Sequence, residues 1–86
     1  MTPEQSRAAR GWLGWSQAEL ARRARVSVGT VKSFESRQKT PLINNLASMQ
    51  RAIETAGIRV VFDKNGAAAG ILRQEADLDL PPDTPG

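Results

Sequence analysis

The chain has 86 residues and a formal net charge of +3, and it contains neither cysteine nor histidine. This length suits one small domain, and the missing residue types exclude disulfides, the usual zinc sites and serine–histidine–aspartate catalysis. No apolar run has the length of a membrane span or a signal peptide, so we expect a cytoplasmic protein without a metal or a cofactor.

Charge is distributed unevenly along the chain. All 12 lysines and arginines lie in residues 1–73 together with five acids, which gives this part a charge of +7. Residues 74–86 hold four acids and no base, a charge of −4. A basic body is typical of proteins that bind a polyanion, but it is equally typical of an ordinary solvated surface.

A first helix is predicted from the start of the chain to about Leu13. Thr2 suits its N-cap, Pro3 suits the first helical position, and Gln5 suits the partner position of a capping box. Gly14 then ends this helix.

Two further helices follow with almost no room between them. Ser16 is predicted to cap the second helix, with Glu19 as its capping-box partner, and this helix ends near Ala24. Ser27 is predicted to cap a third helix that continues to about Ser36. The two caps are only 11 residues apart, which predicts a very tight turn and a sharp crossing of the two helices.

A fourth helix is predicted over residues 43–56, with Gly57 as its C-terminal cap. Residues 58–63 then change to the period of a strand, residues 64–66 favour a turn, and residues 69–73 form a weaker second strand.

Residues 74–86 are acidic and rich in proline, which predicts a disordered tail. Such a tail shields the basic body, binds a partner, or is inert, and the sequence leaves these three possibilities open.

The stretch from Ser16 to Glu35, SQAELARRARVSVGTVKSFE, resembles the helix-turn-helix of the Cro/CI-type (XRE) family of phage and bacterial repressors. The resemblance covers roughly residues 4–57. It implies a mainly α, lambda-repressor-like bundle of four to five helices, here followed by a C-terminal β-strand or hairpin. The domains then divide into residues 1–57 for DNA binding, residues 58–73 as a dimerisation element and residues 74–86 as the tail.

One residue of the motif departs from the family. The turn between the second and third helices usually holds glycine, because its φ is positive, but this chain has Arg25. Arginine adopts that conformation at a cost of order 1 kcal/mol. We expect the turn to form nevertheless.

The resemblance also implies roles for individual residues. A partly buried ion pair joins Arg10 and Glu35. The residues that face the bases of the DNA major groove are Val28, Gly29, Lys32 and Ser33. The residues that contact DNA phosphates are Ser16, Gln17, Ser27, Thr30, Arg37, Lys39 and Thr40.

The base-reading set is poor in groups that form paired hydrogen bonds with base edges. Val28 suits a thymine methyl group, Gly29 permits close approach of the backbone, and Lys32 reaches either guanine or a phosphate. We therefore expect one or two strong base contacts per subunit, with DNA shape supplying the remaining specificity.

The strand at residues 58–63 needs a partner and a cover. Ile58, Val60 and Phe62 lie on one face of it, and we expect them to form a homodimer by pairing strands across a two-fold axis. In the alternative, the hairpin packs on the fourth helix of its own chain and helices form the dimer.

These features together predict a transcriptional regulator that binds double-stranded DNA in a sequence-specific manner. We expect a homodimeric repressor or autoregulator that binds a palindromic operator and has no membrane partner. A protein antagonist is compatible with such a regulator, as in mobile elements. The alternative is an antitoxin that binds a toxin through its tail and hairpin and also binds its own promoter. An enzyme is disfavoured, because the acids are scattered and no glycine-rich phosphate loop is present.

Overall fold

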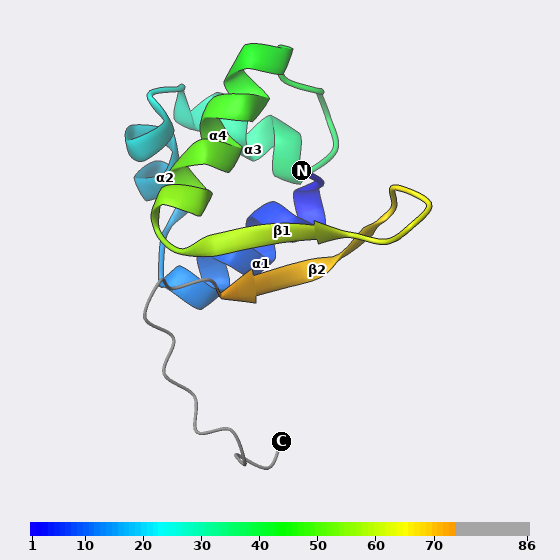
Figure 1. The fold of residues 1–86 in the computed structure, drawn as a ribbon. Coiled ribbons are helices and arrows are strands. Elements are labelled where there is room, and N and C mark those ends of the chain that lie inside the picture. Colours follow the sequence, from blue (N-terminus) through cyan, green and yellow to red (C-terminus); the bar gives the residue numbers. More distant parts are fainter. Residues whose placement is uncertain (74–86) are drawn as a thin grey trace.

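The computed structural model describes residues 1–73. Its elements in chain order are α1 (Pro3–Leu13), α2 (Gln17–Ala24), α3 (Val28–Glu35), α4 (Ile43–Thr55), β1 (Ile58–Phe62) and β2 (Ala68–Arg73). The helices form a bundle, and the two strands form an antiparallel hairpin beside α1 and α4 (Figure 1). The predicted mainly α fold with a C-terminal hairpin is therefore confirmed. The predicted tail, residues 74–86, lies outside the described residues.

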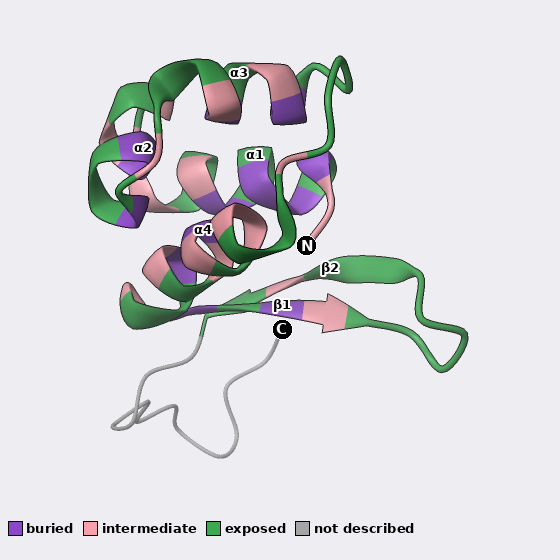
Figure 2. Cartoon of the chain, turned by 90° about the horizontal axis from the view of Figure 1, so that it is seen from above, coloured by how far each residue is buried: buried purple, intermediate pink, exposed green. Residues whose placement is uncertain are grey.

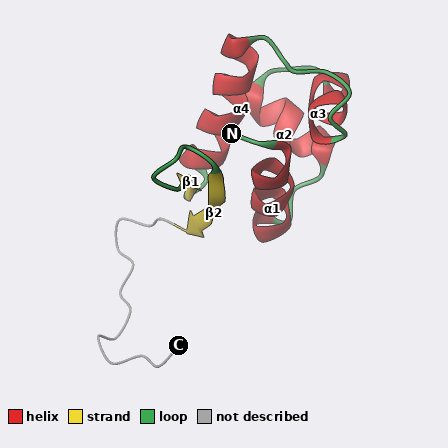
Figure 3. Ribbon diagram, turned by 90° about the vertical axis from the view of Figure 1, so that its right-hand side faces the viewer, coloured by secondary structure: helices red, strands yellow, loops and turns green. Residues whose placement is uncertain are grey.

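The hairpin and the third helix lie on opposite sides of the bundle. Figure 3 shows the strands against α1 and α4, with α3 at the far side of the helices. α2 packs against both α3 and α4, so it holds the third helix in place. The face of α3 that points away from the bundle is consequently distant from the sheet.

The helices begin where the sequence predicts. The capping box of α1 is complete. The backbone N–H of Gln5 donates to Thr2 Oγ1 at 3.2 Å, and the backbone N–H of Thr2 donates to Gln5 Oε1 at 3.0 Å. Ser16 caps α2 by accepting from the Glu19 amide at 3.0 Å, and Ser27 caps α3 in the same manner. The capping box predicted for α2 is only half right, because the Glu19 carboxylate pairs with arginines of its own helix instead of returning to the cap.

The helix ends divide into two kinds. α1 is followed by Gly14 at φ 70° and α4 by Gly57 at φ 98°, whereas α2 is followed by Arg25 at φ 59°. The strained turn predicted at Arg25 is confirmed. A second arginine in the same conformation, Arg37 at φ 62°, follows α3 and was not predicted.

Both arginine turns close in the same way. The Arg25 and Val26 amides donate back into the last turn of α2, and the Arg37 and Gln38 amides donate back into that of α3. This pattern satisfies helix carbonyls that otherwise lack a donor, and it stabilises the left-handed residue in each turn.

The core lies where α2, α3, α4 and β1 meet. Leu20, Val31, Met49, Ile53 and Ile58 are almost completely buried there. Figure 2 shows buried residues on the inner faces of the helices and on part of β1, while most of β2 is exposed.

A side chain of α1 bonds to both strands of the hairpin. Gln5, the capping-box residue, is buried, and its Nε2 donates to the carbonyl oxygens of Val61 at 2.9 Å and Gly70 at 3.1 Å. These two residues face each other across the two strands. The first turn of α1 therefore holds both strands of the sheet.

The dimerisation role predicted for two of the three strand residues needs correction. Ile58 is 1% exposed and Val60 is 7% exposed, so both are covered within the chain. The reason is that β2 pairs with β1 and that α4 packs against it, as in the alternative considered for the hairpin. Phe62, which lies toward the hairpin tip, remains 43% exposed.

Candidate nucleic-acid interface

The outer face of α3 carries the residues predicted to read bases. Val31 and Phe34 are buried and fix the helix against the bundle. Val28, Gly29 and Lys32 are exposed on the other side. The structure therefore presents these three side chains or backbone positions to solvent, as expected, while Ser33 lies half-buried at the border.

A groove runs between α3 and the loop that leads into α4. It brings together six of the predicted contact residues: Ser27, Gly29, Thr30, Ser33, Lys39 and Thr40. Leu42 and Asn45 at the start of α4 also line it, although sequence analysis did not select them. The sequence carried no signal for either residue, and only the structure shows that Leu42, although apolar, is 73% exposed. The groove thus combines hydroxyl groups, one ammonium group and an exposed apolar side chain.

Gly29 is not required by the fold of the chain itself. A Cβ atom placed on it meets only Ser27 Oγ, at 3.8 Å, which is an ordinary contact. Glycine inside a helix nevertheless costs about 1 kcal/mol relative to alanine. A glycine of this kind is typical of a position where a ligand approaches the backbone closely.

The predicted ion pair between α1 and α3 is confirmed. Arg10 donates to both carboxylate oxygens of Glu35, from Nε at 2.9 Å and from Nη2 at 2.7 Å. The Glu35 side chain is 2% exposed and that of Arg10 is 18% exposed. A pair this well shielded from water differs strongly from a surface salt bridge.

Further donors complete the shell around the Glu35 carboxylate. Ser6 Oγ donates to it at 2.6 Å, and Gln17 Nε2 donates at 3.1 Å. Burial raises the pKa of Glu35, but the hydrogen bonds from Arg10, Ser6 and Gln17 outweigh it and hold this pKa below its ordinary value. The carboxylate is consequently ionised, and it ties α1, α2 and α3 together.

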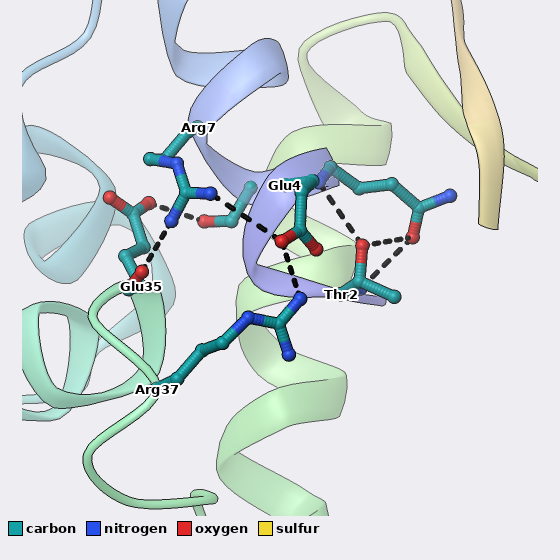
Figure 4. A network of polar contacts seen from close by, with 7 residues as sticks. Thr2, Glu4, Arg7, Glu35 and Arg37 are labelled. Carbon is teal, nitrogen blue, oxygen red and sulfur yellow. Dashed lines mark hydrogen bonds and ion pairs between the residues drawn. The ribbon is translucent and has the colours of Figure 1, made fainter.

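Arg7 adds a second bond to the same residue. Its guanidinium donates to the backbone carbonyl of Glu35, which lies in the last turn of α3 (Figure 4). Cations in this position also interact favourably with the negative end of the helix dipole. The end of α3 is thus held through both its side chain and its backbone.

The position of Gln17 agrees only partly with the predicted phosphate contact. Its amide is turned toward Glu35, an arrangement that the sequence did not suggest. An amide nitrogen carries two protons, so one remains for an external acceptor. Ser16, directly before it, is exposed at the N-terminus of α2.

Arg37 lies away from the groove. Its guanidinium forms an ion pair with Glu4 of α1, and Figure 4 shows the two side chains meeting beside Arg7. Hydrogen bonding from Arg37 holds the pKa of Glu4 below its ordinary value. Both side chains are largely exposed, and such pairs contribute little to stability. A phosphate contact by Arg37 therefore requires this pair to open.

Residues 1–73 contain no helix that is long and apolar enough to cross a membrane. In the same part of the chain, no three acidic residues come close enough to hold a metal ion.

Comparisons with known proteins place these features in context. The helix-turn-helix family HTH_3 matches residues 7–56, more than half of the chain. Among solved structures, the chain is similar to the DNA-binding domain of the P22 C2 repressor, determined in solution by nuclear magnetic resonance. The two share 29% identity over 60% of this chain and 68% of that one, with a TM-score of 0.56. No curated protein matches the chain significantly.

Proposed function

Because the chain belongs to the XRE-type helix-turn-helix family, a family of DNA-binding transcriptional regulators, we propose that it represses transcription at a palindromic operator, which it binds as a homodimer. Its own promoter is the simplest target. The protein then acts in the cytoplasm and joins the nucleoid when bound.

The observation that carries this proposal is the groove beside α3. It collects six predicted contact residues from two elements on the side of the bundle opposite the hairpin. A helix-turn-helix places the outer face of its second helix, here α3, in the major groove of DNA, while neighbouring loops contact the DNA backbone. The excess of basic residues in residues 1–73 suits a polyanion at this face.

Base recognition falls to the exposed residues of α3. Val28 provides an apolar contact for a thymine methyl group, and Gly29 lets the helix backbone approach the base edges. Lys32 reaches a guanine edge or a phosphate, and Ser33 supplies an adaptable hydroxyl. This set supports few strong base contacts, so the deformability of the operator contributes to specificity.

Phosphate contacts fall to groups at the helix N-termini and in the loop after α3. Ser16 and Gln17 lie at the start of α2, and Ser27 and Thr30 lie at the start of α3. A helix N-terminus favours an anion because its N–H groups and dipole point toward it. Lys39 and Thr40 complete the set from the opposite wall of the groove, and Arg37 joins it when it leaves Glu4.

Dimerisation is assigned to the hairpin. Each strand of the two-stranded sheet has one edge without a partner strand in the described part of the chain. Phe62 is exposed beside such an edge, while Ile58 and Val60 hold the hairpin to its own body. A dimer presents two α3 helices to half-sites about 34 Å apart on one face of DNA.

The decisive experiment selects bound DNA from a random pool at two salt concentrations. A palindromic motif retained at both concentrations is the expected result. Binding without a sequence motif, with a steep loss of affinity in salt, would reject the proposal in favour of nonspecific coating.

A further inference from the structure

A second groove lies between α2 and α4 and shares no residue with the groove beside α3. Three arginines line it: Arg23 and Arg25 at the end of α2, and Arg51 on α4. Small residues form much of the remaining wall, and Thr55 and Ala56 close it at the end of α4. The groove therefore has basic groups from both helices, and small side chains form the rest of its wall.

Two of these arginines are available for an ion pair with another segment. Arg23 is already engaged, because its Nε lies 2.7 Å from Glu19 and its guanidinium lies over the Trp15 ring. Arg25 and Arg51 are exposed, and neither forms an ion pair within residues 1–73. The groove thus holds two guanidinium groups that no acid of the described chain neutralises.

Arg25 is also an unexpected residue for its place. The turn holds it at φ 59°, where glycine fits without strain. The turn itself has no use for a guanidinium group, since its hydrogen bonds are made by backbone atoms. An acidic partner outside the turn explains why an arginine stands at this position.

The chain leaves the fold close to this groove. The last residue of β2, Arg73, pairs with Ile58, which follows Ala56 by two residues. Figure 1 shows the end of β2 on the same side of the molecule as the end of α4. The next 13 residues hold four acids and no base, the acids being Glu75, Asp77, Asp79 and Asp83.

The reach and the pattern of this segment suit the groove. An extended chain covers up to about 3.5 Å per residue, so Asp77 and Asp79 lie within about 20 Å of contour from Arg73. A helix with its side chains is only about 10–12 Å across. Leu78 and Leu80 alternate with the two aspartates, so a bound extended segment turns acids to one side and leucines to the other.

We propose that the α2–α4 groove binds residues 74–86 of the same chain. Carboxylates of the segment pair with Arg25 and Arg51, and its leucines lie on the small residues between them. This intramolecular contact is independent of the proposed operator. It neutralises basic groups that lie outside the groove beside α3, and so reduces nonspecific attraction to polyanions without covering that groove.

The test uses the full chain with one spin label. Because the sequence has no cysteine, Thr84→Cys provides a unique attachment site in the acidic segment. Amide signals of Arg25, Arg51 and Thr55 should lose most of their intensity by paramagnetic relaxation, whereas those of Lys32 and of Asn65 at the hairpin tip should not. High salt should restore the affected signals, because it screens ion pairs.

Matched variants decide the cause. Arg25→Gln and Arg51→Gln should each restore much of the lost intensity, and Arg59→Gln, an exposed arginine of β1, should not. Arg51→Gln changes only an exposed position of α4, so it remains decisive if Arg25→Gln fails to fold. Loss of signal at Lys32 and Lys39 instead, or loss nowhere, overturns the proposal. Loss only between isotope-labelled and spin-labelled copies in a mixed sample overturns it as well, because the contact is then between chains.

Discussion

The inner and outer sides of the helix-turn-helix use the same kind of ionic contact with different effect. On the inner side, Glu35 is enclosed between three helices and accepts from Ser6, Arg10 and Gln17. On the outer side, Glu19 is 30% exposed and pairs with two arginines of its own helix that are 69% and 47% exposed. The comparison teaches that enclosure by several elements, rather than the number of charges, makes an ion pair structural.

Replacement of the enclosed carboxylate should give the largest effect. Glu35→Ala leaves Arg10 poorly solvated and unpaired, and it removes the common acceptor of three helices. We expect the free energy of unfolding to fall by roughly 3–5 kcal/mol. Urea unfolding followed by circular dichroism measures it. Glu19→Ala is the matched control on the outer side and should leave the unfolding midpoint nearly unchanged. Equal effects of the two substitutions would contradict the comparison.

Lowering the pH should progressively weaken the contacts by which Glu35 joins the three helices. The pKa of Glu35 is lowered in the folded state, so its contribution is complete above the unfolded pKa of about 4.3 and is lost as pH falls through and below that value. The stability difference between the native chain and Glu35→Gln should therefore shrink between about pH 5 and pH 3. Urea midpoints across this range provide the measurement. A difference that stays constant with pH would show that the charge of Glu35 is not what binds the helices.

The turn between α2 and α3 should respond in the opposite direction. Arg25→Gly removes the left-handed strain, and we expect stability to rise by about 1 kcal/mol. The gain is partly offset, because glycine makes the unfolded chain more flexible. Arg37→Gly, at the equivalent turn after α3, provides a second measurement of the same effect. Thermal unfolding of both variants tests it, and a lower midpoint for Arg25→Gly would contradict the strain.

A substitution on the outer face of α3 should change stability and DNA binding in opposite directions. Gly29→Ala has room for its methyl group and should stabilise the helix by about 0.5–1 kcal/mol. If DNA approaches the backbone there, the same methyl group should weaken binding to the selected operator. Unfolding and binding assays on one variant reveal the two signs. Unchanged operator affinity would mean that Gly29 does not lie against DNA.

Local signals in the sequence were sufficient for most of the helical body. The caps at Thr2, Ser16 and Ser27 and the stop at Gly14 act through backbone groups within one turn, so short motifs predict them. The pairing of Arg10 with Glu35 came from the family resemblance, since nothing local links residues so far apart in sequence.

Contacts that depend on tertiary packing were not predicted. The pairing of Glu4 with Arg37 and the second role of Gln5 join residues that are distant in sequence. The same limit explains Ile58 and Val60: an apolar strand face needs cover, but the sequence does not say whether its own helices or a second chain supplies it.

The double role of Gln5 has a consequence for how the molecule moves. One amide closes the first turn of α1 and holds both strands, so opening the hairpin also releases the start of the helix. The two segments should therefore exchange their amide protons as one cooperative unit. If two copies pair through their hairpins, the angle between the copies reaches α3 through α1 and its contacts with Glu35. The spacing of the two recognition helices then depends on a glutamine at the far side of the domain.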